Sequence, residues 1–261
     1  MTTPDPLPVL LAPFVTHPER AGIFCDFDGT LSAIVDDPDM ARPVPGAVDV
    51  LARLAARYAV VAVVSGRPAG FLRDHLGSRG LVLSGLYGLE WVTDGQIEAV
   101  EGASDWRDIV ADVATRAERP DGPGVRVERK GLSVALHYRL SRERERDARE
   151  WADAEARRTG LVVHPGRLCC ELRPPIERDK GSAVRELAAG LEAVCFLGDD
   201  AGDLAAFDAL DKLEREGRLA LRVGVRSAEA PPELLARADV QVEGPAGVVE
   251  LLERLIPPLL R

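Results

Sequence analysis

Two aspartates stand one residue apart where a short apolar run ends. Ile23, Phe24 and Cys25 have the pattern of a buried strand, and Asp26 and Asp28 follow it directly. Like charges this close raise each other's pKa and destabilise a site unless a cation lies between them. This first cluster (residues 26–30, DFDGT) therefore predicts a site that recruits a metal ion or a basic side chain. A turn with a helix cap is the alternative reading.

Two further clusters stand at the starts of helices. The second cluster (residues 65–67, SGR) ends a β-branched run, and a hydroxyl with backbone N–H groups at a helix start forms an anion site. An ordinary strand-to-helix turn is the alternative. The third cluster (residues 179–181, DKG) opens a helix that Asp179 can cap. Lys180 lies near the positive end of that helix dipole, which is locally unfavourable and marks it as a functional candidate.

The fourth cluster (residues 198–203, GDDAGD) contains three aspartates. Capping explains one of them but not three. Asp199 and Asp203 are four residues apart at a helix start, so they can share a face and orient one another or a cation. Carboxylates without a thiol or a nearby imidazole select a hard cation, and Mg²⁺ fits best.

Alternating strands and helices are needed to bring these clusters together. Apolar patterning predicts strands at 23–25, 58–66, 80–85, 193–198, 219–225 and 238–242, and helices at 46–57, from 68, at 180–190, 201–210, near 233 and at 246–255. This rhythm predicts an α/β fold with a doubly wound, Rossmann-like parallel sheet, in which ligands gather at the carboxyl ends of the strands.

The middle of the chain breaks this rhythm. We expect helices at 105–119 and 142–158, and strands at 125–130, 133–140, 161–165 and 167–174. The αββαββ order predicts a smaller α+β cap domain (102–176) inserted into a core domain (1–101 and 177–261). The charge run from Arg142 to Arg158 is typical of a solvated helix face.

Composition narrows the partners. A formal net charge of -10 argues against nucleic acid or an anionic membrane surface, and an anionic substrate needs local cations. The first twenty residues lack a basic region and contain prolines, so they predict neither a signal peptide nor a membrane helix. The four cysteines have no metal or disulfide spacing, which favours buried thiols in a reducing compartment. We expect a cytoplasmic monomer.

In this order, the four clusters resemble the signature motifs of the haloacid-dehalogenase-type phosphohydrolases. The resemblance implies that Asp26 is a nucleophile that forms an aspartyl-phosphate and that Asp28 is the general acid and base. Lys180 would offset the charge between carboxylates and phosphate. The phosphoryl oxygens would be held by Thr30, Ser65, Gly66 and Lys180. Mg²⁺ would be ligated by Asp26, the Asp28 carbonyl and Asp199, with support from Asp200 and Asp203.

Longer segments resemble the trehalose-6-phosphate phosphatases, which act on a sugar phosphate. They are "SGLYGLEW" (84–91), with Tyr87 in place of the usual histidine and Glu90 as a supporting glutamate, "ERKGLSVALHYR" (128–139) and "CELRPPIERDKGSAV" (170–184). The fourth cluster departs from the family pattern, because Gly202 replaces a threonine and Leu204 a glutamate. Residues implied to bind the substrate are Arg67, Glu128, Lys130, His137, Arg139 and Glu171.

Several alternatives stay open. The sugar could instead be a sucrose phosphate or a mannosyl phosphate, and a phosphomutase also uses paired aspartates. A catalytically inactive phosphatase-like regulator is a further alternative. The presence of Asp26, Asp28, Lys180 and Asp199 argues against it, because an inactive protein has no physical need to keep all four. The cap residues could simply form an exposed polar sheet face. Without a linked glucosyltransferase-like domain in this sequence, we expect a stand-alone enzyme for the last step of trehalose biosynthesis.

Overall fold

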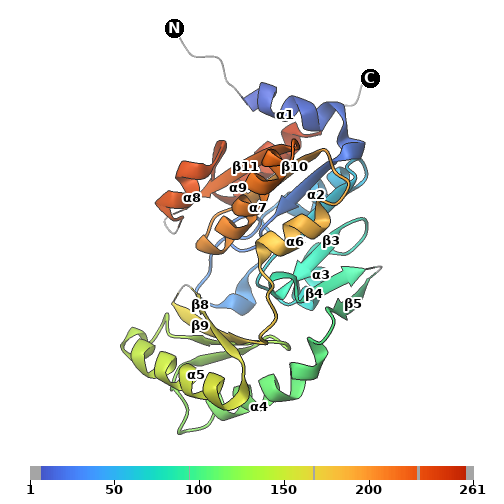
Figure 1. The fold of residues 1–261 in the computed structure, drawn as a ribbon. Helices are drawn as coiled ribbons and strands as arrows, with labels where there is room; N and C mark the ends of the chain where they lie inside the picture. Colours follow the sequence, from blue (N-terminus) through green and yellow to red (C-terminus); the bar gives the residue numbers. More distant parts are fainter. Residues whose placement is uncertain (1–6, 94, 167, 228–229, 257–261) are drawn as a thin grey trace. The chain divides into compact units, whose positions relative to one another are not determined.

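An eight-stranded sheet runs through the first of two units into which the chain divides (Figure 1). The computed structural model describes residues 7–93, 95–166, 168–227 and 230–256. The first unit consists of residues 1–98 and 178–261, and the second of residues 99–177. The boundaries expected from the sequence were 101/102 and 176/177.

Six of the eight strands are parallel neighbours, in the order β12-β11-β10-β1-β2-β3. Their bounds are β1 Ala21–Cys25, β2 Val60–Val64, β3 Val82–Gly85, β10 Ala193–Gly198, β11 Leu219–Arg226 and β12 Val240–Glu243. The central strands are buried on both faces, which explains their continuous β-branched and apolar runs. The doubly wound α/β prediction is confirmed.

Two strands that the sequence analysis missed extend this sheet. β4 (Glu90–Thr93) pairs antiparallel with β3, and β5 (Gln96–Ala99) follows it at the edge. The signal was present, because an Asp-Gly pair at 94–95 separates two short alternating runs, as in a β-hairpin.

Helices cover both faces of the sheet. Ile23 and Cys25 of β1 belong to one core cluster, and Phe24 belongs to the other, as alternation along a strand requires. The hydrophobic core on the Ile23 side includes residues of α1 (Leu7–Thr16), α2 (Ala47–Ala55), α3 (Ala69–Leu76) and α9 (Gly244–Arg254). The hydrophobic core on the Phe24 side includes residues of α6 (Lys180–Leu187), α7 (Leu204–Arg215) and α8 (Pro232–Arg237).

Helix α1 was not anticipated. Prolines interrupt this apolar segment, and Pro13 lies inside the helix, yet Leu11 and Phe14 are buried three residues apart on its inner face. Tertiary packing therefore outweighs a poor local propensity. Across the described ranges, every helix is too short or too polar to cross a lipid bilayer.

The second unit has its own core. Its antiparallel sheet has the order β6-β7-β9-β8, and α4 and α5 pack their apolar residues against one face. The bounds are α4 Arg107–Ala117, β6 Arg126–Arg129, β7 Val134–His137, α5 Glu145–Thr159, β8 Val162–Gly166 and β9 Cys169–Arg173. Charged pairs such as Arg146 with Glu150 lie along the exposed side of α5.

Short 3-10 turns occupy the junctions between the main elements. They are η1 Pro18–Arg20, η2 Pro38–Met40, η3 Leu86–Gly88, η4 Ser104–Trp106, η5 Arg142–Arg144 and η6 Ala201–Asp203. Three of them (η2, η3 and η6) lie near the residues singled out from the sequence, so loops at strand ends carry the candidate chemistry.

Candidate active site

The first and fourth clusters meet at the carboxyl ends of β1 and β10. The backbone N–H of Asp26 donates to the Leu197 carbonyl at 2.9 Å, and its side chain is buried. Gly29 has a φ of +80°, and a Cβ at this position would overlap the Asp199 carboxylate. Only glycine therefore allows the chain to turn so close to the neighbouring strand. The Thr30 hydroxyl lies 3.5 Å from Asp199 Oδ1.

Lys180 joins the third cluster to the other two. Asp179 caps α6 by accepting the Ser182 N–H at 2.6 Å. The next residue, Lys180, is buried, and its Nζ lies 2.8 Å from Asp26 Oδ1 and 2.7 Å from Asp203 Oδ1. The helix start thus places an ammonium between two carboxylates, which offsets its unfavourable place in the helix dipole.

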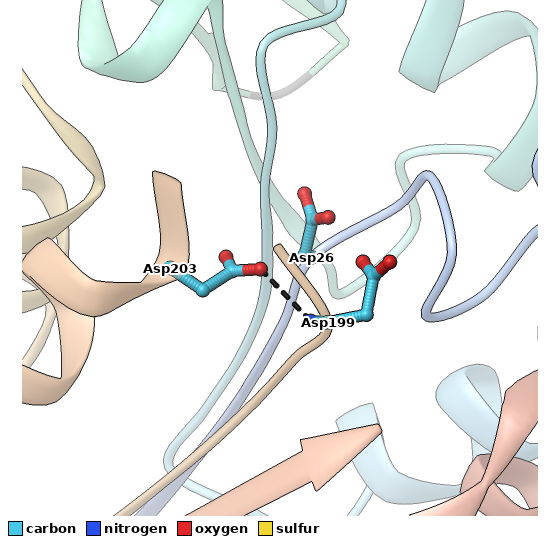
Figure 2. A group of neighbouring side chains, drawn as sticks. All are labelled: Asp26, Asp199 and Asp203. Atoms are coloured by element: carbon cyan, nitrogen blue, oxygen red, sulfur yellow. Dashed lines mark hydrogen bonds between the residues drawn. The ribbon is translucent and has the colours of Figure 1, made fainter. Parts of the chain in front are cut away.

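Three buried carboxylates lie close together in this site (Figure 2). One oxygen each from Asp26, Asp199 and Asp203 lies within 4.8 Å of the others. Asp203 Oδ2 also accepts the backbone N–H groups of Asp199 at 2.9 Å and Asp200 at 3.0 Å. The Asp200 side chain is half exposed and accepts the Gly202 N–H, so it caps η6. The three aspartates of the fourth cluster therefore have different environments.

Burial dominates the electrostatics of these groups. Burial, together with the charges of Asp203, Asp200 and Asp199, raises the pKa of Asp26 well above its usual range, although Lys180 lowers it. Burial and the neighbouring carboxylates raise the pKa of Asp199 to about 8 and that of Asp203 to about 6. One ammonium is insufficient for this many carboxylates. An all-oxygen donor set with surplus negative charge fits a hard divalent cation such as Mg²⁺.

The second cluster follows β2 and is fixed by a strained turn. The Ser65 and Arg67 carbonyls accept the N–H groups of Tyr87 and Leu86, each at 2.9 Å. Leu86 and Tyr87 have positive φ angles of 49° and 60°, which non-glycine residues rarely adopt. A Cβ at Gly66 would overlap the Tyr87 ring. The tyrosine that replaces the family histidine thus packs directly against the second cluster.

Glu90 supports the same region from β4. Its side chain is buried, and Oε2 accepts the N–H of Ala69, the first residue of α3, at 3.1 Å. The carboxylate therefore takes the part of an N-cap from a distant strand. The Ser65 hydroxyl is also buried and accepts the Arg67 N–H at 3.2 Å.

Arg67, predicted to bind the substrate, contacts the second aspartate of the first cluster. Its guanidinium is buried and donates to both carboxylate oxygens of Asp28, at 2.7 Å each. The structure thus provides one cation for each aspartate of the first cluster, Lys180 for Asp26 and Arg67 for Asp28.

The candidate substrate residues of the second unit form two groups on the face of its sheet opposite the helices. His137 Nε2 and Glu128 Oε2 lie 2.8 Å apart. Lys130 Nζ lies 3.4 Å from Glu171 Oε1. Arg139 lies just beyond the end of β7 and is half buried. Period-two spacing along the strands places these side chains on a shared face.

Glu171 has more polar partners within its own unit than the sequence indicated. Ser133 Oγ donates to its Oε1 at 2.5 Å, and Arg173 Nη2 donates to its Oε2 at 2.7 Å. Burial raises the pKa of this carboxyl, but Lys130 and Arg173 outweigh burial and hold it at about 2. Sequence reasoning missed Ser133 and Arg173. The spacing of Glu171 and Arg173, two apart in one strand, was a usable signal.

Comparison with solved structures identifies the fold. A haloacid dehalogenase-like hydrolase from Bacteroides thetaiotaomicron matches 90% of this chain and 99% of its own, with a TM-score of 0.62 and 17% identity. This likeness shows the fold. A trehalose-6-phosphate phosphatase related protein matches 90% of this chain and 96% of its own, with a TM-score of 0.76 and 27% identity. The chain therefore shares its fold with a haloacid dehalogenase-like hydrolase and with a trehalose-6-phosphate phosphatase related protein.

The sequence comparisons define the family. The trehalose-phosphatase family model matches residues 24–234, and the chain belongs to this family. A trehalose-phosphate phosphatase from Mycobacterium marinum is 37% identical over 98% of this chain. The chain spans 66% of the length of that relative and 63% of a relative from Mycobacterium avium.

Proposed function

We propose that this chain is a Mg²⁺-dependent phosphatase that hydrolyses trehalose 6-phosphate to trehalose and phosphate. One observation carries the proposal: buried Lys180 bridges Asp26 and Asp203, and Asp199 lies beside them. A carboxylate nucleophile can approach a phosphate dianion only where cations compensate the repulsion. Membership of the trehalose-phosphatase family supports the choice of sugar.

The reaction would proceed in two steps through Asp26. Its carboxylate oxygen forms a bond to phosphorus while the bond from phosphorus to the sugar oxygen breaks, and Asp28 gives a proton to that leaving oxygen. A water oxygen then attacks phosphorus, the bond to Asp26 breaks, and Asp28 takes the proton of the water. The products are trehalose, phosphate and the restored carboxylate.

The remaining core residues would bind the phosphoryl group. The Thr30 and Ser65 hydroxyls and the Gly66 N–H would donate to its oxygens, while Lys180 compensates its charge. Asp26, the Asp28 carbonyl and Asp199 would hold Mg²⁺, with Asp203 and Asp200 fixing their loop. The ion would supply further positive charge at the phosphate.

The sugar would be recognised by the second unit. Charged side chains on the polar face of its sheet can donate to and accept from sugar hydroxyls, and a site built in this way rejects ligands that leave those groups unpaired. The proposed sugar-binding residues are Glu128, Lys130, His137, Arg139 and Glu171. Buried Glu171, which already contacts Ser133 and Arg173, would also orient its neighbours.

A phosphate-release assay with Mg²⁺ across a panel of sugar phosphates tests this function. We expect the highest kcat/KM with trehalose 6-phosphate and loss of activity in excess EDTA. A higher value with a sucrose or mannosyl phosphate would overturn the sugar assignment. Isomerisation of a hexose phosphate without phosphate release would indicate a phosphomutase, and inactivity on every ester would indicate a regulator.

We further propose that the enzyme works as a cytoplasmic monomer. Its four cysteines are free thiols, three of them buried, which accords with a reducing compartment. Sedimentation equilibrium should give the mass of one chain, and localisation of the tagged protein should show a cytoplasmic signal.

A further inference from the structure

The candidate general acid is held by a two-point contact. Arg67 Nε donates to Asp28 Oδ2 and Nη2 donates to Oδ1, both at 2.7 Å. Two parallel charged hydrogen bonds of this kind fix the plane of the carboxylate as well as its position. The arginine is 7% exposed, whereas the Asp28 side chain is 38% exposed. The buried partner therefore directs the exposed one.

The guanidinium is itself fixed from other sides. Nη1 donates to the Pro38 carbonyl at 2.8 Å, and the guanidinium carbon lies 4.8 Å from the centre of the Phe71 ring. The Phe71 ring contacts the Phe27 ring edge-on, with ring centres 5.6 Å apart, and it stacks on the His75 ring, with ring centres 4.1 Å apart. These contacts orient the guanidinium so that its Nε–H and Nη2–H groups point at the two oxygens of the Asp28 carboxylate.

This contact joins three separate segments of the core unit. Asp28 follows β1, Pro38 begins η2, and Phe71 lies in α3. Arg67 lies 39 residues from Asp28 and 29 from Pro38 along the chain. The direction of the Asp28 carboxylate thus depends on how these segments pack.

We infer that Arg67 is a positioning residue, which aims the Asp28 carboxylate at the leaving oxygen and at the attacking water. This inference rests on the proposed phosphatase function. It differs from the substrate-binding role that the family resemblance implied for Arg67, and that role stays a prediction. A general acid must lie within hydrogen-bond reach of the proton acceptor, and a misplacement of about 1 Å can cost about 10²-fold in rate.

Arg67→Met and Arg67→Lys test the inference with trehalose 6-phosphate as substrate. We expect kcat to fall by about 10²-fold in both variants, with KM within about threefold of wild type. Lysine keeps the charge but cannot form the fork, so it should not rescue. A raised KM with unchanged kcat, or rescue by lysine, would overturn the positioning role.

An activated ester separates the two steps that need Asp28. The ester is p-nitrophenyl phosphate, whose leaving group, p-nitrophenolate, departs without a proton. Arg67→Met should therefore release about one equivalent of p-nitrophenolate in a fast burst. Turnover should then be slow, because the water step still needs an aimed base. A burst slowed as much as turnover on trehalose 6-phosphate would show that Arg67 acts on phosphate binding instead.

A double-mutant cycle shows whether Arg67 acts through Asp28. In an Asp28→Asn background, Arg67→Met should reduce kcat by less than about twofold further. Independent, multiplying losses would contradict the inference. Each unfolding midpoint should be recorded, and Arg67→Lys provides the second variant if methionine does not fold.

Arg222→Met is a matched control. Arg222 is also buried and donates to three carboxylates, those of Asp211, Glu214 and Asp239, none of which belongs to the candidate site. It should lower the unfolding midpoint and change activity on both esters by the same factor. Wild-type inactivity on both esters would overturn the proposed function and this inference together, whereas an active wild type with unaffected Arg67 variants would overturn the inference alone.

Discussion

At the scale of single residues, the Asp26 carboxylate and its contact with Lys180 decide whether the site can form a covalent intermediate. Asp26→Asn keeps the shape of the side chain but replaces the nucleophilic oxygen with an amide. We expect turnover to vanish while the fold stays intact, because Lys180 keeps its contact with Asp203 and the loss of one buried carboxylate relieves repulsion from Asp203 and Asp199. Phosphate release and the unfolding midpoint measure both effects. Wild-type turnover in the variant would show that Asp26 is not the nucleophile.

Asp199 permits a test of metal binding that does not depend on activity. Its pKa is raised to about 8 by burial and by its acidic neighbours, so Asp199→Asn should raise the unfolding midpoint without Mg²⁺. In the wild type, Mg²⁺ at about 100 times its Kd should stabilise the fold by about 2.7 kcal/mol. The variant should lose most of this gain.

Asp74→Asn is the control for that experiment. Asp74 is exposed on α3, and it pairs with Arg73 rather than with the acidic cluster. This variant should keep the full Mg²⁺-dependent shift in differential scanning calorimetry. Equal shifts in the Asp199 variant and the control would show that Asp199 is not a metal ligand.

At the scale of elements, the second unit contains a carboxylate whose stabilising effect depends on pH. Lys130 and Arg173 outweigh the cost of burial and hold the pKa of Glu171 at about 2, below the ordinary value of 4.5. The ionised form is therefore the stable one in the folded state. Its contribution is fully present above about pH 4.5 and is lost as the pH falls toward 2.

Glu171→Gln should remove this pH dependence. Between pH 5 and pH 2 the wild type should lose about 3 kcal/mol that the variant does not, since each pKa unit corresponds to about 1.4 kcal/mol. Urea unfolding of both proteins at several pH values measures the difference. A constant difference across this range would contradict the contribution of Glu171.

The segment from the end of β3 to the start of β4 contacts the second cluster and α3, which are distant from it in the sequence. The turn between β3 and β4 places Leu86 and Tyr87 in left-handed backbone, where their N–H groups reach the carbonyls of the second cluster. Glu90, the first residue of β4, caps α3. Strain of this kind persists only where surrounding contacts compensate it. The segment therefore supports the second cluster and the start of α3.

At the scale of the whole molecule, two units with separate cores suggest separate tasks. The core unit contains the groups proposed to act on the phosphate and the ester oxygen. Every sugar phosphate contains these two parts, so the core unit does not distinguish one sugar from another. Discrimination between sugars should therefore depend on the second unit. Glu128→Ala should reduce kcat/KM for trehalose 6-phosphate by roughly ten- to two-hundred-fold, the equivalent of about 1.5–3 kcal/mol for a charged hydrogen bond. Hydrolysis of p-nitrophenyl phosphate should change little.

Glu118→Ala provides the comparison within the same unit. Glu118 is also a glutamate paired with a basic side chain, since it accepts from Arg129 at 2.8 Å and 2.7 Å, but it lies on the surface of the unit. It should leave both activities close to wild type. Equal losses on both esters in the Glu128 variant would mean that this residue supports the fold rather than the sugar.

The sequence by itself determined how the six parallel strands of the core alternate with helices, and the places of the four clusters, although it left out α1, β4 and β5. Apolar runs, helix caps and turn glycines are local signals, and parallel strands that alternate with helices must end at one edge. That geometry predicts that the four clusters lie at one edge of the sheet, and the family resemblance implied that Asp26, Lys180 and Asp199 act together there, where the structure places them. The αββαββ order of the second unit was equally readable from local periodicity.

Only the tertiary structure decided the contacts that join distant segments. The fork from Arg67 to Asp28 spans 39 residues, and the contact from Glu90 to Ala69 spans 21. No local pattern encodes such pairs, because they depend on how strands and helices pack. Helix α1 was missed for the same reason, since burial of Leu11 and Phe14 outweighs the proline within it. Periodicity shows which side of an element is buried, but packing selects the partner.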